Sequence, residues 1–133
     1  MRRRARGMRR RAEGGAAVAD FVLVSVLVLV VFVAVVQLGL ALFTRNVLIS
    51  CASEGARYGA RADAFPQDGV ARTQQLVSTS LSPRFARSVS AAESVVGGVR
   101  VVEVWVVAPL PVIGLLGPDR ALDVVGRAYA EEQ

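Results

Sequence analysis

Histidine is absent from this chain of 133 residues, and cysteine occurs once, at Cys51. A single cysteine excludes a disulfide within the chain, and the lack of histidine excludes imidazole general bases, histidine-containing triads and histidine-ligated metals. The acidic residues Glu103, Asp119 and Asp123 do not have a recognisable metal-ligand spacing, and we interpret them as solvent-facing strand and loop positions. The sequence therefore predicts no catalytic, cofactor-binding or metal-binding residue, and we expect a protein that is not an enzyme.

Lysine is also absent, so all sixteen basic residues are arginines. The formal net charge of +5 is unevenly distributed along the chain. Residues 1–15 carry a net charge of +6, whereas residues 16–133 carry −1. Because the basic character belongs to the N-terminal segment alone, the charge distribution argues against nucleic-acid binding by the rest of the chain.

A run of 23 residues, Phe21–Phe43, contains no charged residue. The run is apolar and is interrupted only by Ser25, Gln37 and Gly39. At about 1.5 Å of rise per residue, a helix of this length crosses a hydrocarbon layer about 30 Å thick. Seven arginines precede the run, and the positive-inside rule then keeps the N-terminus in the cytoplasm. We expect a single-pass protein of the cytoplasmic membrane whose C-terminal domain is extracytoplasmic.

Composition divides the chain into four expected segments. Residues 1–15 form an arginine-rich cytoplasmic leader, and residues 16–44 form a transmembrane helix. Residues 45–64 continue this helix beyond the membrane, and residues 65–133 form a small extracytoplasmic α+β domain. One helix is expected over about residues 16–62, because the apolar run passes without proline into an alanine-rich stretch.

The helix is expected to break at residues 65–69, Phe-Pro-Gln-Asp-Gly, because proline disfavours helical conformation in the residue before it. The pair Asp68-Gly69 is a turn signal. Alternatively, Asp68 caps a second helix over residues 70–77.

Three candidate strands follow, at residues 85–96, 99–107 and 121–129. Trp105, in the second strand, is interpreted as a core residue. The connection at residues 108–120 contains three prolines, so we expect an irregular excursion whose apolar part packs on the rest of the domain. The predicted fold class is α+β, with a long N-terminal helix followed by a small antiparallel sheet.

A possible processing site precedes the apolar run. A cut after Gly15 leaves Ala16 as the new N-terminus and places Asp20 at the fifth position of the shortened chain. This arrangement resembles the class III signal of type IV prepilins, where the family has glutamate in place of Asp20. A carboxylate in an apolar bundle is costly when unpaired, and the α-amine freed by cleavage supplies a cation. We predict leader cleavage between Gly15 and Ala16 and an assembly salt bridge made by Asp20.

A helix-packing block is predicted farther along the helix. Cys51, Gly55 and Gly59 recur every four residues beside three alanines, so one helix face carries only small side chains and admits another helix at close range. On the adjacent face Glu54 can pair with Arg57 or Arg61 and stack near Tyr58. The alternative is that these residues only stabilise an exposed helix. The block consists of Cys51, Glu54, Gly55, Arg57, Tyr58 and Gly59.

Three features together resemble the TadE-like pseudopilins of the tight-adherence (Tad, type IVc) pilus system. They are the opening GGAAVADFVLV at residues 14–24, the stretch ASEGARYGA at residues 52–60, and a valine-rich strand followed by a proline-rich loop and a last strand. The second feature is similar to the family's A-x-E-G-A-R-Y-A-A block. A departure is Ala19, which separates Val18 from the acid, whereas the family has valine followed directly by glutamate.

The resemblance implies a minor pilin or pseudopilin, a structural component in pilus assembly that a prepilin peptidase matures. It implies other pilins, the peptidase and the inner-membrane assembly platform as partners, in addition to membrane lipids. Whether such a protein enters the pilus or only primes its assembly is left open.

Two alternatives also remain open at this point. An arginine-rich segment before an apolar run is typical of an uncleaved signal anchor on a bitopic protein. The stretch Leu48–Cys51 has the look of a bacterial lipobox, with Cys51 as the lipid acceptor. In either case the chain is an envelope protein that binds a partner through its outer domain.

Overall fold

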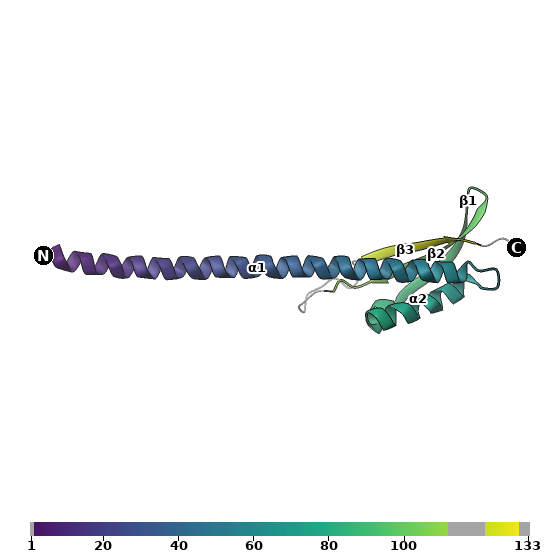
Figure 1. The fold of residues 1–133 in the computed structure, drawn as a ribbon, viewed down its shortest axis with the longest axis horizontal. Coiled ribbons are helices and arrows are strands. Elements are labelled where there is room, and N and C mark those ends of the chain that lie inside the picture. The colour runs from purple at the N-terminus through teal and green to yellow at the C-terminus, as the bar shows by residue number, and fades with distance from the viewer. Residues whose placement is uncertain (1, 112–121, 131–133) are drawn as a thin grey trace. The chain divides into compact units, whose positions relative to one another are not determined.

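The computed structural model describes residues 2–111 and 122–130, so most of the proline-rich connection, which we expected to pack on the domain, lies outside the described residues. The chain divides into two compact units, Met1–Leu38 and Gly39–Gln133. Helices come first and an antiparallel sheet follows, which confirms the predicted α+β class (Figure 1). The elements are α1 (Arg2–Gly59), α2 (Pro66–Ser80), the 3₁₀ turn η1 (Pro83–Ala86), β1 (Ser88–Val96), β2 (Val99–Ala108) and β3 (Leu122–Tyr129).

Helix α1 begins at Arg2, well before residue 16, where the sequence predicted its start. The physical reason is that residues 2–13 are rich in arginine and alanine, which are strong helix formers. The role of residues 1–15 as a leader stays a prediction. The helix ends at Gly59, close to the predicted end.

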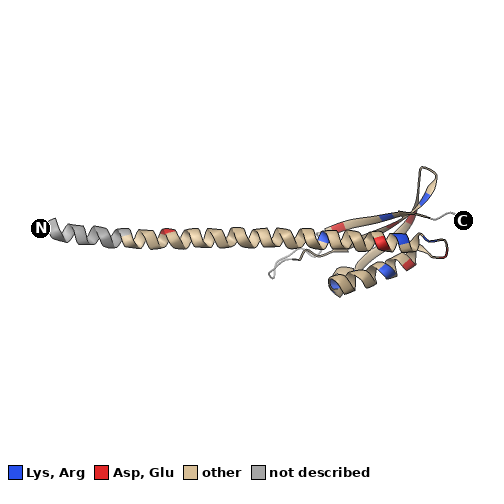
Figure 2. Cartoon of the chain, in the orientation of Figure 1, with Lys and Arg blue, Asp and Glu red and all other residues tan. Residues whose placement is uncertain are grey.

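The first unit contains the long apolar segment of α1. Every large hydrophobic side chain from Val18 to Val35 is exposed in the monomer, and the next residue, Val36, is partly buried. This helix is long and apolar enough to cross a membrane. Figure 2 shows the corresponding uncharged stretch of α1, which follows Asp20 and continues up to Arg45. The exposed apolar surface needs lipid or other helices to cover it.

Helix α2 begins at Pro66, where a missing N–H costs nothing because the first helical donors have no partner within the helix. The residue before it, Phe65, is the extended N-cap, and its N–H donates a 2.8 Å hydrogen bond to Oδ2 of Asp68. Asp68 therefore does cap a second helix, but from the third helical position and toward the backbone behind it. Gly69, Thr73 and Val77 are the buried residues of α2.

The sheet has the order β1-β2-β3, and both neighbouring pairs are antiparallel. Gly97 and Gly98 connect β1 to β2 with φ angles of +62° and +85°, which side-chain-bearing residues adopt only with strain. Residue 105 pairs with Ser90 on one side and Val125 on the other. The three predicted strands are confirmed, but β1 begins at Ser88 because Phe85 belongs to η1, and β2 ends at Ala108, one residue later than predicted.

Alternate residues of β2 define the two faces of the sheet. Val102, Val104 and Val106 are almost fully buried on the face that the helices cover. Trp105 points to the opposite face by the two-residue period of a strand and is only partly buried. The interpretation of this tryptophan as a core residue was therefore wrong, because a run of valines does not reveal which alternate positions face inward.

The core of the second unit is built around Leu48, Ala52 and Ala56 of α1. These residues pack with Val77 of α2 and with the inward residues of β2 and β3. Gly126 of β3 allows the close approach of α1, because a Cβ atom there would lie 2.5 Å from the carbonyl oxygen of Ala52. The sheet and α2 thus share one face of the final turns of α1.

Candidate functional site

The predicted cleavage site lies within the helical first unit. Gly14 and Gly15 are exposed, and a Cβ atom added at either position would have no neighbour within 4 Å. Ala16 and Asp20 are exposed as well. Among the described residues Asp20 forms no ion pair, and the α-amine proposed as its partner exists only after a cut before Ala16. Cleavage and the salt bridge remain predictions.

The small-residue face of α1 is covered by α2 of the same chain. A Cβ atom at Gly55 would collide with Oγ1 of Thr73 and lie 2.7 Å from the carbonyl oxygen of Gly69. A Cβ atom at Gly69 would in turn lie 2.6 Å from the carbonyl oxygen of Gly55. Gly59 has a looser fit, since its added Cβ would lie 3.2 Å from the carbonyl oxygen of Phe65. Two glycines therefore face each other where the helices pack most closely.

Thr73 is buried within this helix contact. Its hydroxyl donates a 2.8 Å hydrogen bond to the carbonyl oxygen of Gly69 in its own helix, so the buried polar group is satisfied. A helix from another protein can reach the small-residue face of α1 only if α2 leaves it. The sequence pattern indicated a close helix neighbour but did not identify it as the following helix.

Cys51 lies outside the apolar run, in the packed part of α1, with a relative exposure of 6%. Burial raises the pKa of its thiol, and a smaller opposing effect comes from a hydrogen bond with the Ser80 side chain. The sulfur is therefore a neutral, weakly nucleophilic thiol at neutral pH. Its position indicates that it packs the contact between α1 and α2.

The charged residues of the packing block lie on exposed positions of α1. Glu54, Arg57 and Tyr58 are all exposed. The guanidinium of Arg61 lies 5.3 Å from the centre of the Tyr58 ring and makes a 3.4 Å ion pair with Asp63. Among the described residues Glu54 forms an ion pair with neither Arg57 nor Arg61, and Arg61 pairs with Asp63 instead.

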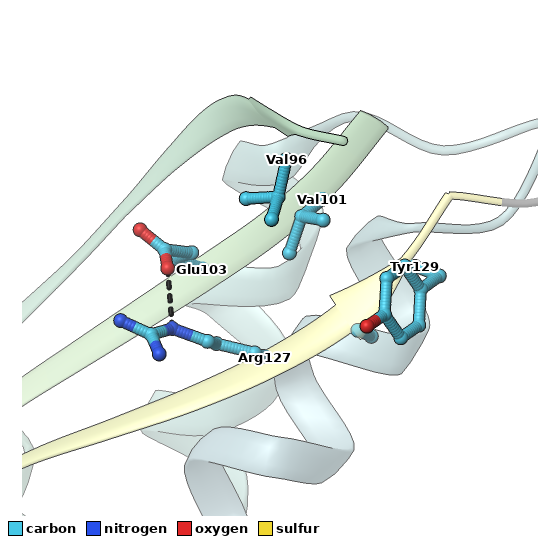
Figure 3. A pocket seen from close by; sticks show the side chains of 6 residues that line it. Val96, Val101, Glu103, Arg127 and Tyr129 are labelled. Atoms are coloured by element: carbon cyan, nitrogen blue, oxygen red, sulfur yellow. Dashed lines mark ion pairs between the residues drawn. The ribbon is translucent and has the colours of Figure 1, made fainter. Parts of the chain in front are cut away.

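A shallow cavity of about 270 Å³ lies on the sheet face opposite the helices. In Figure 3 the side chains of Glu103 from β2 and Arg127 from β3 point toward each other across the strands, and their ion pair forms one side of the cavity. Val96 and Tyr129 form part of its apolar wall. Sequence reasoning missed this pair, because the register that places Glu103 opposite Arg127 is set by tertiary structure.

The described residues that line the cavity are an ion pair, a tyrosine and small apolar side chains, a combination that is not typical of a catalytic site. Glu103 has a side-chain exposure of 13% because it is paired with Arg127, so it is less solvent-facing than expected, whereas Asp123 is exposed. Asp119 lies outside the described residues. Within residues 14–111 and 122–130, whose side chains the structure describes, no group of three histidine, cysteine, aspartate or glutamate residues could hold a metal ion.

Comparison with known families gives a match over part of the chain. The family described as TadE-like protein matches residues 15–57, about a third of the chain. The matched segment begins at the predicted cut, includes the whole apolar run and ends inside the packing block. The resemblance stated from the sequence is confirmed over this segment. No curated protein and no solved structure matches the chain significantly.

Proposed function

We propose that this chain, TadE-like over residues 15–57, is a minor pilin or pseudopilin that acts as a structural component in the assembly of a bacterial Tad pilus. The observation that supports this most strongly is the extent of the match. It joins the predicted cleavage site, the exposed apolar helix and the start of the packing block in one continuous segment. The proposed role is one of assembly through helix packing and not of catalysis.

The apolar part of α1 is the proposed assembly element. Its exposed side chains first lie in the cytoplasmic membrane, with the N-terminus in the cytoplasm and the second unit outside. A prepilin peptidase removes residues 1–15, and Asp20 then pairs with the α-amine of Ala16, either its own or that of a neighbouring pilin. The same helix face exchanges lipid for other pilin helices at the inner-membrane assembly platform.

The lipid-anchored alternative has little support from the geometry around Cys51. Its sulfur is buried between α1 and α2, so an attached diacylglyceryl group would need the space that α2 occupies. A lipoprotein cut before Cys51 would also lose most of the segment that matches the family. The uncleaved bitopic protein is the alternative that the following experiment separates from the pilin.

The test is the N-terminus of the protein isolated from cells that contain a prepilin peptidase. We expect the sequence to begin at Ala16, and to begin at Met1 in a matched strain without the peptidase. In a host that makes Tad pili, deletion of the gene should abolish surface pili, and the wild-type gene should restore them. An intact N-terminus with the peptidase present, together with normal pili in the deletion strain, would contradict the proposed function.

A further inference from the structure

The second unit has a distinct end at which the apolar helix enters it. Leu42 and Phe43 of α1 are exposed, whereas Thr44 and Leu48 are buried at 3% and 0% relative exposure. The packed part of the unit therefore begins abruptly at Thr44. Phe43, the last residue of the apolar run, directly precedes Thr44 in the helix.

The C-terminal end of α2 and the turn η1 lie at this same end of the unit. The contacts between the helices progress in opposite directions along the two sequences, from Gly59 with Gly69, through Gly55 with Thr73, to Cys51 with Ser80. Residues after Ser80 therefore lie level with the first packed turns of α1. Phe85 and Ala86 of η1 are buried in the same core cluster as Leu48, which agrees with this placement.

Three exposed arginines surround this end, and we call them the basal surface: Arg45, Arg84 and Arg87. Arg84 stacks its guanidinium 4.7 Å from the centre of the Phe85 ring. Among the described residues none of the three pairs with a carboxylate. The described acid at this end of the sheet is Asp123, so the three positive charges of the basal surface are accompanied by one negative charge.

Arginines elsewhere in the unit have a different environment. Three of them are neutralised by acids: Arg61 by Asp63, Arg100 by Glu93 and Arg127 by Glu103. Arg57 and Arg72 also form no ion pair, but the described residues of the unit away from this end carry five arginines (57, 61, 72, 100 and 127) and five acids (54, 63, 68, 93 and 103). Their charges therefore balance in number, whereas positive charge is in excess where the apolar run ends. Figure 2 shows this mixture of blue and red positions over the helices and strands of the unit.

We propose that the basal surface binds the phosphate groups of anionic phospholipids at the membrane face from which α1 emerges. Arg45 follows Phe43 by two residues, or about 3 Å along the helix axis, which is within the headgroup layer when Phe43 lies at the edge of the hydrocarbon. Guanidinium groups bind phosphate oxygens in a bidentate manner, and basic residues near a membrane surface are attracted to anionic lipids. The second unit would thereby be held on the membrane before assembly.

This inference rests on the proposed membrane span, but it does not require leader cleavage or a pilus. The test uses the full chain in nanodiscs of phosphatidylcholine and phosphatidylglycerol, with spin-labelled lipids reporting the relative association constant of the two. The basal variant is R45Q/R84Q/R87Q, and the matched control R57Q/R61Q/R100Q removes the same charge from positions away from this end. The arginines of residues 1–15 are present in every protein and contribute an equal background.

We expect the preference for phosphatidylglycerol to fall in the basal variant by up to about fivefold per arginine at low salt, and to persist in the control. The charge-preserving variant R45K/R84K/R87K should retain most of the preference. An equal preference in the basal and control variants, or its loss in the lysine variant, would overturn the basal surface as a lipid site. Release of the wild-type chain from membranes by alkaline carbonate would overturn the membrane span as well.

Discussion

At the scale of single residues, glycines determine how closely the elements of the second unit approach. Gly55 and Gly69 face each other across the contact of α1 with α2, and Gly126 faces the backbone of Ala52 across the contact of α1 with β3. In each place an added methyl group would meet backbone atoms, which cannot rotate away as a side chain can. The small residues therefore have a packing role within this chain, whatever they contact in an assembly.

Substituting Gly55 and Gly59 separately tests this packing role. Alanine at either site favours the helix by up to about 1 kcal/mol. At Gly55 the collision with Thr73 and the backbone of Gly69 should outweigh that gain, because overpacking costs about 1 to 3 kcal/mol. Gly59→Ala should change the free energy of unfolding by less than about 1 kcal/mol, since its nearest neighbours are 3.2 to 3.3 Å from the added atom.

The measurement is urea unfolding in detergent micelles, followed by the fluorescence of the single tryptophan, Trp105. Gly55→Ala should lower the midpoint, and Gly59→Ala should leave it nearly unchanged. Equal destabilisation by the two variants would show that the structure misplaces α2 along α1.

At the scale of elements, the long helix and the three strands were predicted from sequence, whereas α2 was only an alternative and the neighbours of each element were not predicted. The valine-rich pattern of residues 99–107 identified β2. The proline and aspartate at residues 66 and 68 marked a helix break and offered a second helix over residues 70–77 only as an alternative, whereas α2 begins at Pro66 and ends at Ser80. The inward face of β2 and the pairing of Glu103 with Arg127 depend on register, which a strand with valine on both faces does not specify. Gly126 has no sequence signal either, because its role arises from the approach of a helix distant in sequence.

The docking of α2 can be measured through Cys51, the single thiol of the chain. Asp68→Ala removes the acceptor of the 2.8 Å hydrogen bond from the N–H of Phe65, and the loss of such a cap costs about 0.5 to 2 kcal/mol. If α2 opens as a unit, the rate at which a maleimide modifies Cys51 should rise by about two- to thirtyfold.

Asp63→Ala is the matched control, because it removes an exposed carboxylate whose ion pair with Arg61 contributes little to stability. Its labelling rate should stay within about twofold of the wild type. Equal labelling rates for Asp68→Ala and the wild type would show that α2 does not control access to the thiol.

At the scale of the whole molecule, the two units meet different physical requirements. The second unit forms a buried apolar core from its own elements and satisfies Thr73 internally. The first unit leaves its large apolar side chains uncovered, and an apolar environment must supply the missing contacts. Function in assembly is therefore expected to depend on the first unit, and Asp20 is the one carboxylate in its described side chains.

Asp20 should separate membrane insertion from assembly. A charged side chain at the centre of a membrane helix costs about 2.5 to 3.5 kcal/mol, and less toward the edge, so Asp20→Ala should insert at least as well as the wild type. Assembly should fail, because the α-amine of Ala16 then lacks its counter-ion among packed helices. The resemblance to prepilins leads us to expect that Asp20→Glu, which keeps the carboxylate, forms pili. The measurements are the carbonate-resistant membrane fraction and the number of surface pili in a complemented deletion strain, and normal pilus numbers with Asp20→Ala would show that the carboxylate has no part in assembly.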